Sequence, residues 1–149
     1  MFLIHGKSVS DCIKRALDIV LTESEHGDLT IFYVNGTISD KLFYLVKQSK
    51  LSNKEAILKQ FNYEKVDDIV SLKSYLSGID CNRKTIVIVE GLLQILSNGF
   101  SDYTEKNCYL VEILMTLKKS EANHDFKAII LDELNYFVSL HCSDLIKVS

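Results

Sequence analysis

Four short apolar segments along the chain are predicted to form buried strands. They cover Phe2–Ile4, Leu29–Val34, Thr85–Val89 and Ala128–Leu131. Each is rich in β-branched or aromatic residues and is apolar at consecutive rather than alternate positions. That pattern is typical of strands buried on both faces, as in a parallel sheet covered by helices. A fifth segment, Ile57–Phe61, is a weaker strand candidate that could equally form a turn of helix.

Between these segments, apolar residues recur at the three- and four-residue spacing of amphipathic helices. Ser8 or Ser10, Ser39 and Asp102 stand where N-caps are expected, and Gly78 stands where a helix is expected to stop. The predicted apolar faces are Val9, Cys12, Ile13, Ala16, Leu17 and Val20; Leu42, Phe43, Leu45 and Val46; Val66, Ile69, Val70, Leu72 and Leu76; and Tyr103, Leu110, Ile113, Leu114 and Leu117.

Strands that alternate with helices predict an α/β fold, a doubly wound and mainly parallel sheet with helices on both faces. The 149 residues suit a single domain over 1–149, and 47% of them are hydrophobic. No apolar run approaches the roughly 18 residues that a membrane span needs, and the N-terminus lacks the pattern of a signal peptide. We therefore expect an intracellular protein with no membrane partner.

The tripeptide Gly6-Lys7-Ser8 lies between the first strand and the first helix, where a phosphate-binding loop belongs. A working loop reads G-x-x-x-x-G-K-[ST], so that successive backbone N–H groups wrap the phosphates, while Lys and Ser or Thr reach phosphate and magnesium. Here the position five before Gly6 is Met1, and strand residues occupy the rest of the loop. We interpret the tripeptide as a relic of that loop, or as a plain turn with an N-cap.

Two acidic positions end predicted strands in the manner of a Walker B motif. Glu90 follows Ile86–Val89, and Asp132 with Glu133 follows Ala128–Leu131. The second segment, with Asp132 and Glu133, is the better local match to the motif. In active enzymes such an acid orients magnesium or water. The simpler alternative is a solvated residue at the rim of the sheet.

Net charge is −3, so any nucleic-acid binding would need a local basic patch. Candidates for DNA contact are Arg83, Lys84, Lys118 and Lys119, the last two at the expected end of a helix. Lys47, Lys50, Lys54 and Lys59 also lie near the aromatic residues Phe43, Tyr44, Phe61 and Tyr63. The commoner explanation is a solvated helix face.

The four cysteines and four histidines lack the clustering that metal ligation requires, and no dinucleotide fingerprint is present. We therefore expect neither a metal nor a cofactor. Among the histidines, none lies at motif spacing to a nucleophile.

The order and spacing of these features resemble the core of RecA-type recombinases, and in particular the degenerate paralogues of recombination mediator assemblies such as the Shu complex. The resemblance runs over nearly the whole chain, from Gly6-Lys7-Ser8 through Thr85–Gly91 to Ala128–Leu131. It puts Glu90 at the Walker B aspartate, and Asn98–Ser101, which carries no arginine, at a first DNA loop. It also implies a truncated core whose sheet ends before the family's last strands, leaving a part that a partner covers.

The resemblance implies a non-catalytic, nuclear subunit that pairs with another RecA-like paralogue and adds to a DNA-binding surface. One alternative is a small NTPase that uses Lys7, Ser8 and Asp132. Another is a RecA-fold subunit of an unrelated assembly, such as Elongator.

The apolar segment Leu134–Leu140 is the candidate for contact with the partner, since aromatic residues are enriched in interface cores. We expect Tyr136, Phe137 and Val138, together with the edge of the first strand, to form that contact. The same segment could instead pack as a C-terminal helix on its own sheet.

Overall fold

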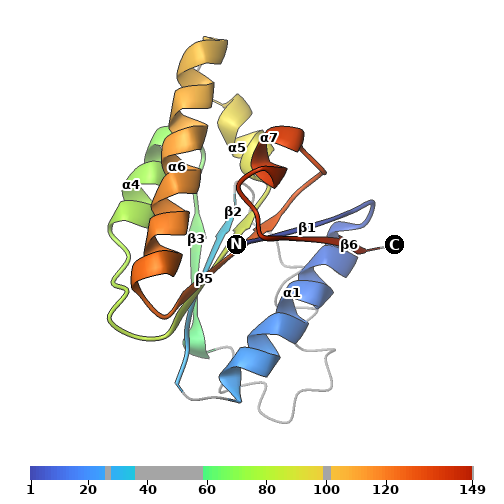
Figure 1. Cartoon of the computed structure of the whole chain (residues 1–149), viewed down its shortest axis with the longest axis vertical. Helices are drawn as coiled ribbons and strands as arrows, with labels where there is room; N and C mark the ends of the chain where they lie inside the picture. The colour runs from blue at the N-terminus through green and yellow to red at the C-terminus, as the bar shows by residue number, and fades with distance from the viewer. Residues whose placement is uncertain (26–27, 36–58, 99–101, 149) are drawn as a thin grey trace.

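Six parallel strands form one sheet in this computed structural model, which describes residues 1–25, 28–35, 59–98 and 102–148. The spatial order is β3-β2-β4-β5-β1-β6 (Figure 1). The strands are β1 (Phe2–Gly6), β2 (Thr30–Asn35), β3 (Phe61–Lys65), β4 (Thr85–Glu90), β5 (Phe126–Leu131) and β6 (Asp144–Val148). The predicted α/β class and the parallel sheet are confirmed.

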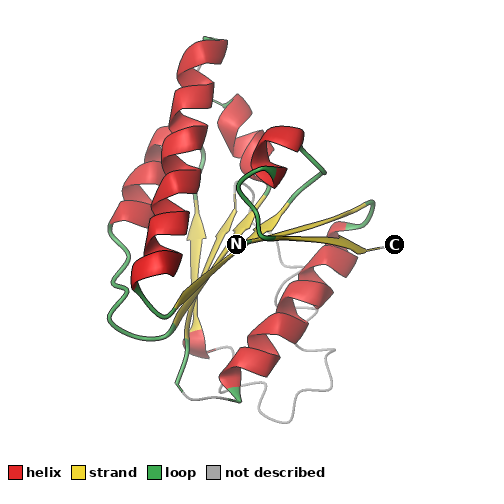
Figure 2. Cartoon of the chain, viewed as in Figure 1, coloured by secondary structure: helices red, strands yellow, loops and turns green. Residues whose placement is uncertain are grey.

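The four central strands β2, β4, β5 and β1 are those that the apolar runs predicted. Ile86 and Ile88 on β4 and Ile129 and Leu131 on β5 are buried, as strands covered on both faces require. The helix α1 (Val9–Ser24) covers one face and packs on these four residues. The opposite face of the sheet is covered by α4 (Ile69–Ser77), α5 (Leu92–Ser97), α6 (Tyr103–Asn123) and α7 (Tyr136–Ser139), as Figures 1 and 2 show.

Local signals explain where the long helices begin. Ser8 accepts a hydrogen bond from the Asp11 amide at the start of α1, and Asp68 accepts one from the Ser71 amide at the start of α4. Asp102 does the same for the Thr104 amide, which confirms the predicted N-cap of α6. Gly78 is the C-cap of α4, as expected.

Two expectations about the sheet edges are wrong. The strand at Ala128–Leu131 is not the last strand of the sheet, because β6 follows it in the chain. β6 pairs with β1, with Phe2 opposite Asp144 and Gly6 opposite Val148. The first strand is therefore not an edge and cannot offer one to a partner. The two edges of the described sheet are β3 and β6.

Three smaller expectations also change. The weak fifth strand was placed too early: β3 begins at Phe61, and residues 59–60 are helical. Tyr103 is 78% exposed rather than buried, because it opens α6 beyond the helices that cover the sheet. Lys118 and Lys119 lie about one turn before the end of α6, which runs on to Asn123.

Several expectations fall outside the described residues. These are the helix after Ser39, the first part of the Ile57–Phe61 candidate, Lys47, Lys50 and Lys54 with Phe43 and Tyr44, and most of the loop at Asn98–Ser101. Within the described ranges, no helix is both long and apolar enough to cross a membrane.

Candidate functional site

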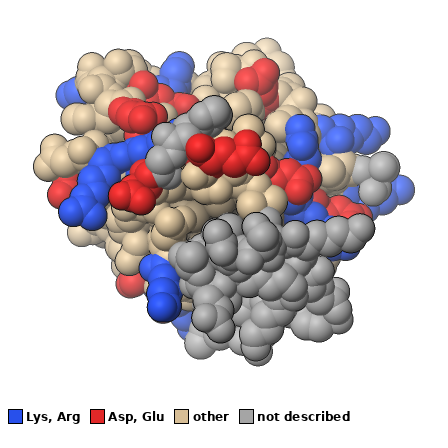
Figure 3. Space-filling model, turned by 90° about the horizontal axis from the view of Figure 1, so that it is seen from below, with Lys and Arg blue, Asp and Glu red and all other residues tan. Residues whose placement is uncertain are grey.

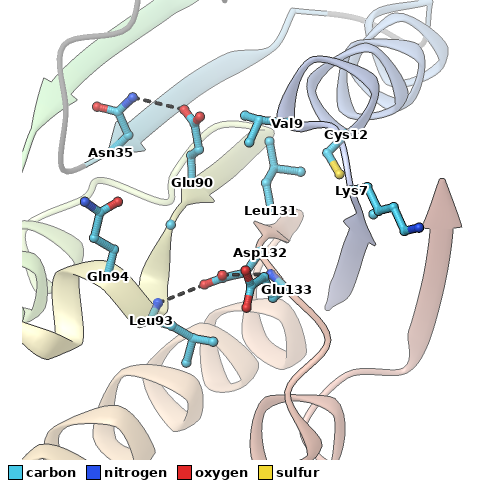
Figure 4. Close-up of a pocket in the computed structure, with 12 residues that line it drawn as sticks. Lys7, Val9, Cys12, Asn35, Glu90, Leu93, Gln94, Leu131, Asp132 and Glu133 are labelled. Carbon is cyan, nitrogen blue, oxygen red and sulfur yellow. Dashed lines mark hydrogen bonds between the residues drawn. The ribbon is translucent and has the colours of Figure 1, made fainter. Parts of the chain in front are cut away.

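A cavity of about 470 Å³ opens at the carboxyl ends of β1, β2, β4 and β5. This is the edge at which open parallel sheets bind their ligands. The cavity brings together the two motif regions that the sequence singled out (Figure 4). Its lining comprises Gly6, Lys7, Val9, Cys12, Asn35, Glu90, Gly91, Leu93, Gln94, Leu131, Asp132 and Glu133.

Gly6 has a packing role in this structure. It is the last residue of β1 and lies opposite Val148 of β6. A Cβ atom at this position would lie far inside contact distance of the Val148 carbonyl oxygen, so only glycine allows β6 to approach. The glycine of the motif is thus explained by the pairing of two strands.

Lys7 and Ser8 are the only residues between β1 and α1, so no extended loop precedes the helix. The Ser8 hydroxyl accepts a hydrogen bond of 3.3 Å from the Asp11 amide, as an N-cap does. Lys7 is exposed and forms no ion pair within the described part of the chain. Its side chain points away from Glu90, Asp132 and Glu133 in Figure 4.

Glu90 is anchored in a polar network that begins on the neighbouring strands. Its Oε2 atom accepts hydrogen bonds from the Tyr33 hydroxyl at 2.7 Å and from the Asn35 amide at 3.0 Å. Asn35, which is 1% exposed, accepts in turn from the Tyr63 hydroxyl at 3.0 Å. The rings of Tyr33 and Tyr63 stack with centroids 5.8 Å apart.

The environment of this network keeps Tyr33 protonated. Burial, followed by the nearby charge of Glu90, raises the pKa of the Tyr33 hydroxyl. Burial also raises the pKa of the Cys12 thiol in the cavity wall, with further contributions from Asp11 and Glu90. Tyr33 therefore acts as a donor to Glu90, and Cys12 is an apolar wall rather than a nucleophile.

Asp132 caps α5 from the end of another strand. Its Oδ2 atom accepts from the Leu93 amide and its Oδ1 atom from the Glu133 amide, both at 2.8 Å. The helix begins after Gly91, which has a φ of +73° and no side chain with which to cap. Burial raises the pKa of the Asp132 carboxyl and the charge of Glu133 adds to the rise, while the two backbone hydrogen bonds oppose it.

The DNA-contact candidates lie away from this cavity. Arg83 and Lys84 precede β4, so they are at the amino edge of the sheet, roughly 17–20 Å from its carboxyl edge. Lys84 pairs with Glu23 at 2.9 Å, and Lys127 pairs with the same carboxylate. Lys118 and Lys119 are exposed on α6. The face of the molecule drawn in Figure 3 carries both acidic and basic side chains.

The partner-contact candidates divide by burial. Tyr136 is 79% exposed, Phe137 is half-buried against His141, and Val138 is 2% exposed and belongs to the core. Val138 is thus excluded from a contact surface, because α7 packs on the sheet through this residue. The exposed apolar side chains of the segment are instead Leu134, Tyr136 and Leu140.

Asn35, Tyr33 and Gly91 were not predicted as site residues, and Tyr63 was named only as an aromatic residue near a basic stretch. The signal for Asn35 was its place directly after a buried apolar run, since a polar residue there faces the carboxyl edge. Gly91 directly follows Glu90, the last residue of β4, and precedes α5. No local pattern marked the tyrosines, whose partners are distant in sequence. Among the described residues, no group of acidic, histidine and cysteine side chains could hold a metal ion.

The strand order and the cavity at the carboxyl edge define an α/β protein with an open, parallel sheet. The crystal structure of the RadB recombinase is similar to this chain, with a TM-score of 0.65 and 17% sequence identity. The match covers 98% of this chain and 72% of the RadB chain. No protein-family model and no curated protein matches the sequence. The shared property is the fold.

Proposed function

We propose that this chain is a non-catalytic RecA-fold subunit of a recombination or repair mediator assembly, in which it pairs with a second RecA-like protein. The similarity in fold to the RadB recombinase supports the recombination class. The observation that carries the non-catalytic role is the structural use of the motif residues. Gly6 admits β6, Ser8 caps α1, and Asp132 caps α5.

The electrostatics of the cavity support the same proposal. Three carboxylates line it, and the one lysine of its lining points outward (Figure 4). Nucleotide phosphates would meet like charge there and would lack the row of backbone N–H groups that a phosphate loop supplies. The alternative of an NTPase that uses Lys7, Ser8 and Asp132 would require all three to leave their present positions or contacts.

Pairing with a partner is supported by the exposed apolar side chains that follow β5. Leu134 and Leu140 are 60% and 61% exposed, and Tyr136 is exposed still further. Exposed apolar groups that lie together are characteristic of interaction surfaces. A contribution to DNA binding remains part of the proposal through Arg83, Lys118 and Lys119, which are exposed.

The direct experiment is affinity purification of the tagged chain from its own cells, followed by identification of the proteins that remain bound. We expect a second RecA-like protein in fixed stoichiometry. The double variant Leu134→Ser, Tyr136→Ser should lose this partner, whereas Tyr103→Ser, which changes an equally exposed tyrosine on α6, should keep it. Recovery of an unrelated assembly, such as Elongator, or of no partner would contradict the proposal.

A further inference from the structure

We infer that the cavity and the adjoining residues Leu134 and Tyr136 form one docking surface, which receives a protein segment carrying a basic side chain next to an apolar one. The inference rests on the proposed function and specifies the partner's chemistry. It commits to an arginine or lysine in the cavity and to an apolar contact on Leu134 and Tyr136. The complementarity of charge and the continuity of the two parts carry it.

The first part of the surface is the acidic interior. Glu90, Asp132 and Glu133 place three carboxylates in one cavity. The helix α5, which also lines the cavity, contains no charged residue. Both hydrogen bonds to Glu90 end on Oε2, which leaves Oε1 to accept from a ligand. The raised pKa of Asp132 is consistent with a carboxylate that has lost water without gaining a cation.

The walls suit the stem of a long basic side chain. Val9, Cys12, Leu93 and Leu131 line the cavity together with the carboxylates. Arginine and lysine bury their methylene groups along apolar surface while the charged head reaches a polar partner. A free metal ion would make no use of these walls.

The second part begins at the next residue. Glu133 lines the cavity and is exposed, Leu134 follows it, and Tyr136 opens α7 two residues later. An apolar residue next to the basic residue of the bound segment would therefore contact the Leu134 and Tyr136 side chains, which are largely exposed. Burial of such a patch is favourable by the hydrophobic effect and would add affinity to the charge pairing.

The test is a titration of the isotopically labelled full chain with two capped peptides. Binding is measured from the changes in the chemical shifts of the backbone amides. The first peptide is acetyl-Leu-Arg-Leu-amide, and the second replaces arginine by citrulline, which has the same shape without the charge. At about millimolar peptide we expect shifts at the amides of Glu90, Gly91, Leu93, Glu133 and Leu134, with citrulline about fivefold weaker or more. Glu133→Gln and Leu134→Ser should each weaken the arginine peptide, whereas Glu105→Gln on α6 should not.

The outcomes separate this inference from the function on which it rests. If neither peptide shifts these amides, or if citrulline acts as well as arginine, the docking surface is disproved while the subunit proposal stands. If MgATP, added as a second titrant, instead shifts Lys7, Ser8 and the cavity amides, the docking surface is overturned, and hydrolysis of the bound ATP would overturn the non-catalytic role as well.

Discussion

At the scale of single residues, the motif positions of this chain serve the packing of its own backbone. Gly6 is required by the approach of β6, and Ser8 and Asp132 satisfy amides at the starts of α1 and α5. A capped helix start is more stable by about 0.5–2 kcal/mol than an uncapped one. These contacts explain the residue types without a nucleotide.

Gly6→Ala should destabilise the protein, because the added Cβ would collide with the Val148 carbonyl group and push β6 from β1. We expect a loss of about 1–3 kcal/mol in the free energy of unfolding, measured by urea titration. Gly78→Ala is the matched control, since a Cβ there would meet its nearest atom at 3.6 Å. Equal stability of the two variants would show that β6 does not depend on Gly6.

Glu23→Gln should remove a contribution to stability that depends on pH. Hydrogen bonds from Lys127 and then Lys84 lower the pKa of the Glu23 carboxyl from its ordinary value of 4.5 to about 2. Because the pKa in the folded state is depressed, this stabilisation is present above about pH 4.5 and is lost as the pH falls toward 2.

The measurement is the free energy of unfolding of both proteins between pH 3 and 7. We expect the wild type to exceed the variant by about 1 kcal/mol or more near pH 7 and the difference to shrink in acid. Glu25→Gln, at an exposed position of the same turn, should show no such trend. A difference that stays constant with pH would rule out the ion pair as its source.

At the scale of elements, the sequence predicted the strands that are buried on both faces and missed those at the edges. β1, β2, β4 and β5 carry consecutive apolar residues, so their pattern was visible. β3 and β6 are half-exposed and contain charged residues, and each has only one neighbouring strand. Short polar segments of this kind acquire their strand conformation from pairing, which no local pattern records.

The short helices and the site network escaped prediction for related reasons. α5 has six residues and α7 has four, too few for helical periodicity to emerge. The candidate residues Gly6, Glu90 and Asp132 could be located from strand ends, but their partners could not. Tyr33 and Glu90 are 57 positions apart, and Asp132 reaches back 39 positions to the Leu93 amide.

Asp132→Ala should loosen the first turn of α5, since it removes the acceptor of the Leu93 amide hydrogen bond. Hydrogen exchange at that amide should accelerate by roughly two- to thirtyfold, as expected for the loss of a helix cap. Glu133→Ala is the control, because the Glu133 side chain accepts no hydrogen bond from α5. If both variants exchange at the wild-type rate, Asp132 does not cap the helix.

At the scale of the whole molecule, a RecA-like fold is combined with an acid-lined cavity and an exposed apolar segment at the same edge of the sheet. The fold alone does not determine activity, because function depends on the site that the fold carries. We propose that the site of this chain favours a basic protein segment over a phosphate. That arrangement suits a subunit that contributes binding rather than hydrolysis.

The central claim, that the Gly6-Lys7-Ser8 region does not hold a nucleotide, is tested most directly by calorimetric titration of the full chain with MgATP, alongside Lys7→Ala. We predict no binding up to about millimolar nucleotide and no hydrolysis above that of buffer. The reason is that Gly6 is committed to the pairing of β1 with β6 and Ser8 to the N-cap of α1. Binding in the micromolar range that Lys7→Ala abolishes would contradict the claim, and hydrolysis lost in the same variant would establish the chain as an NTPase.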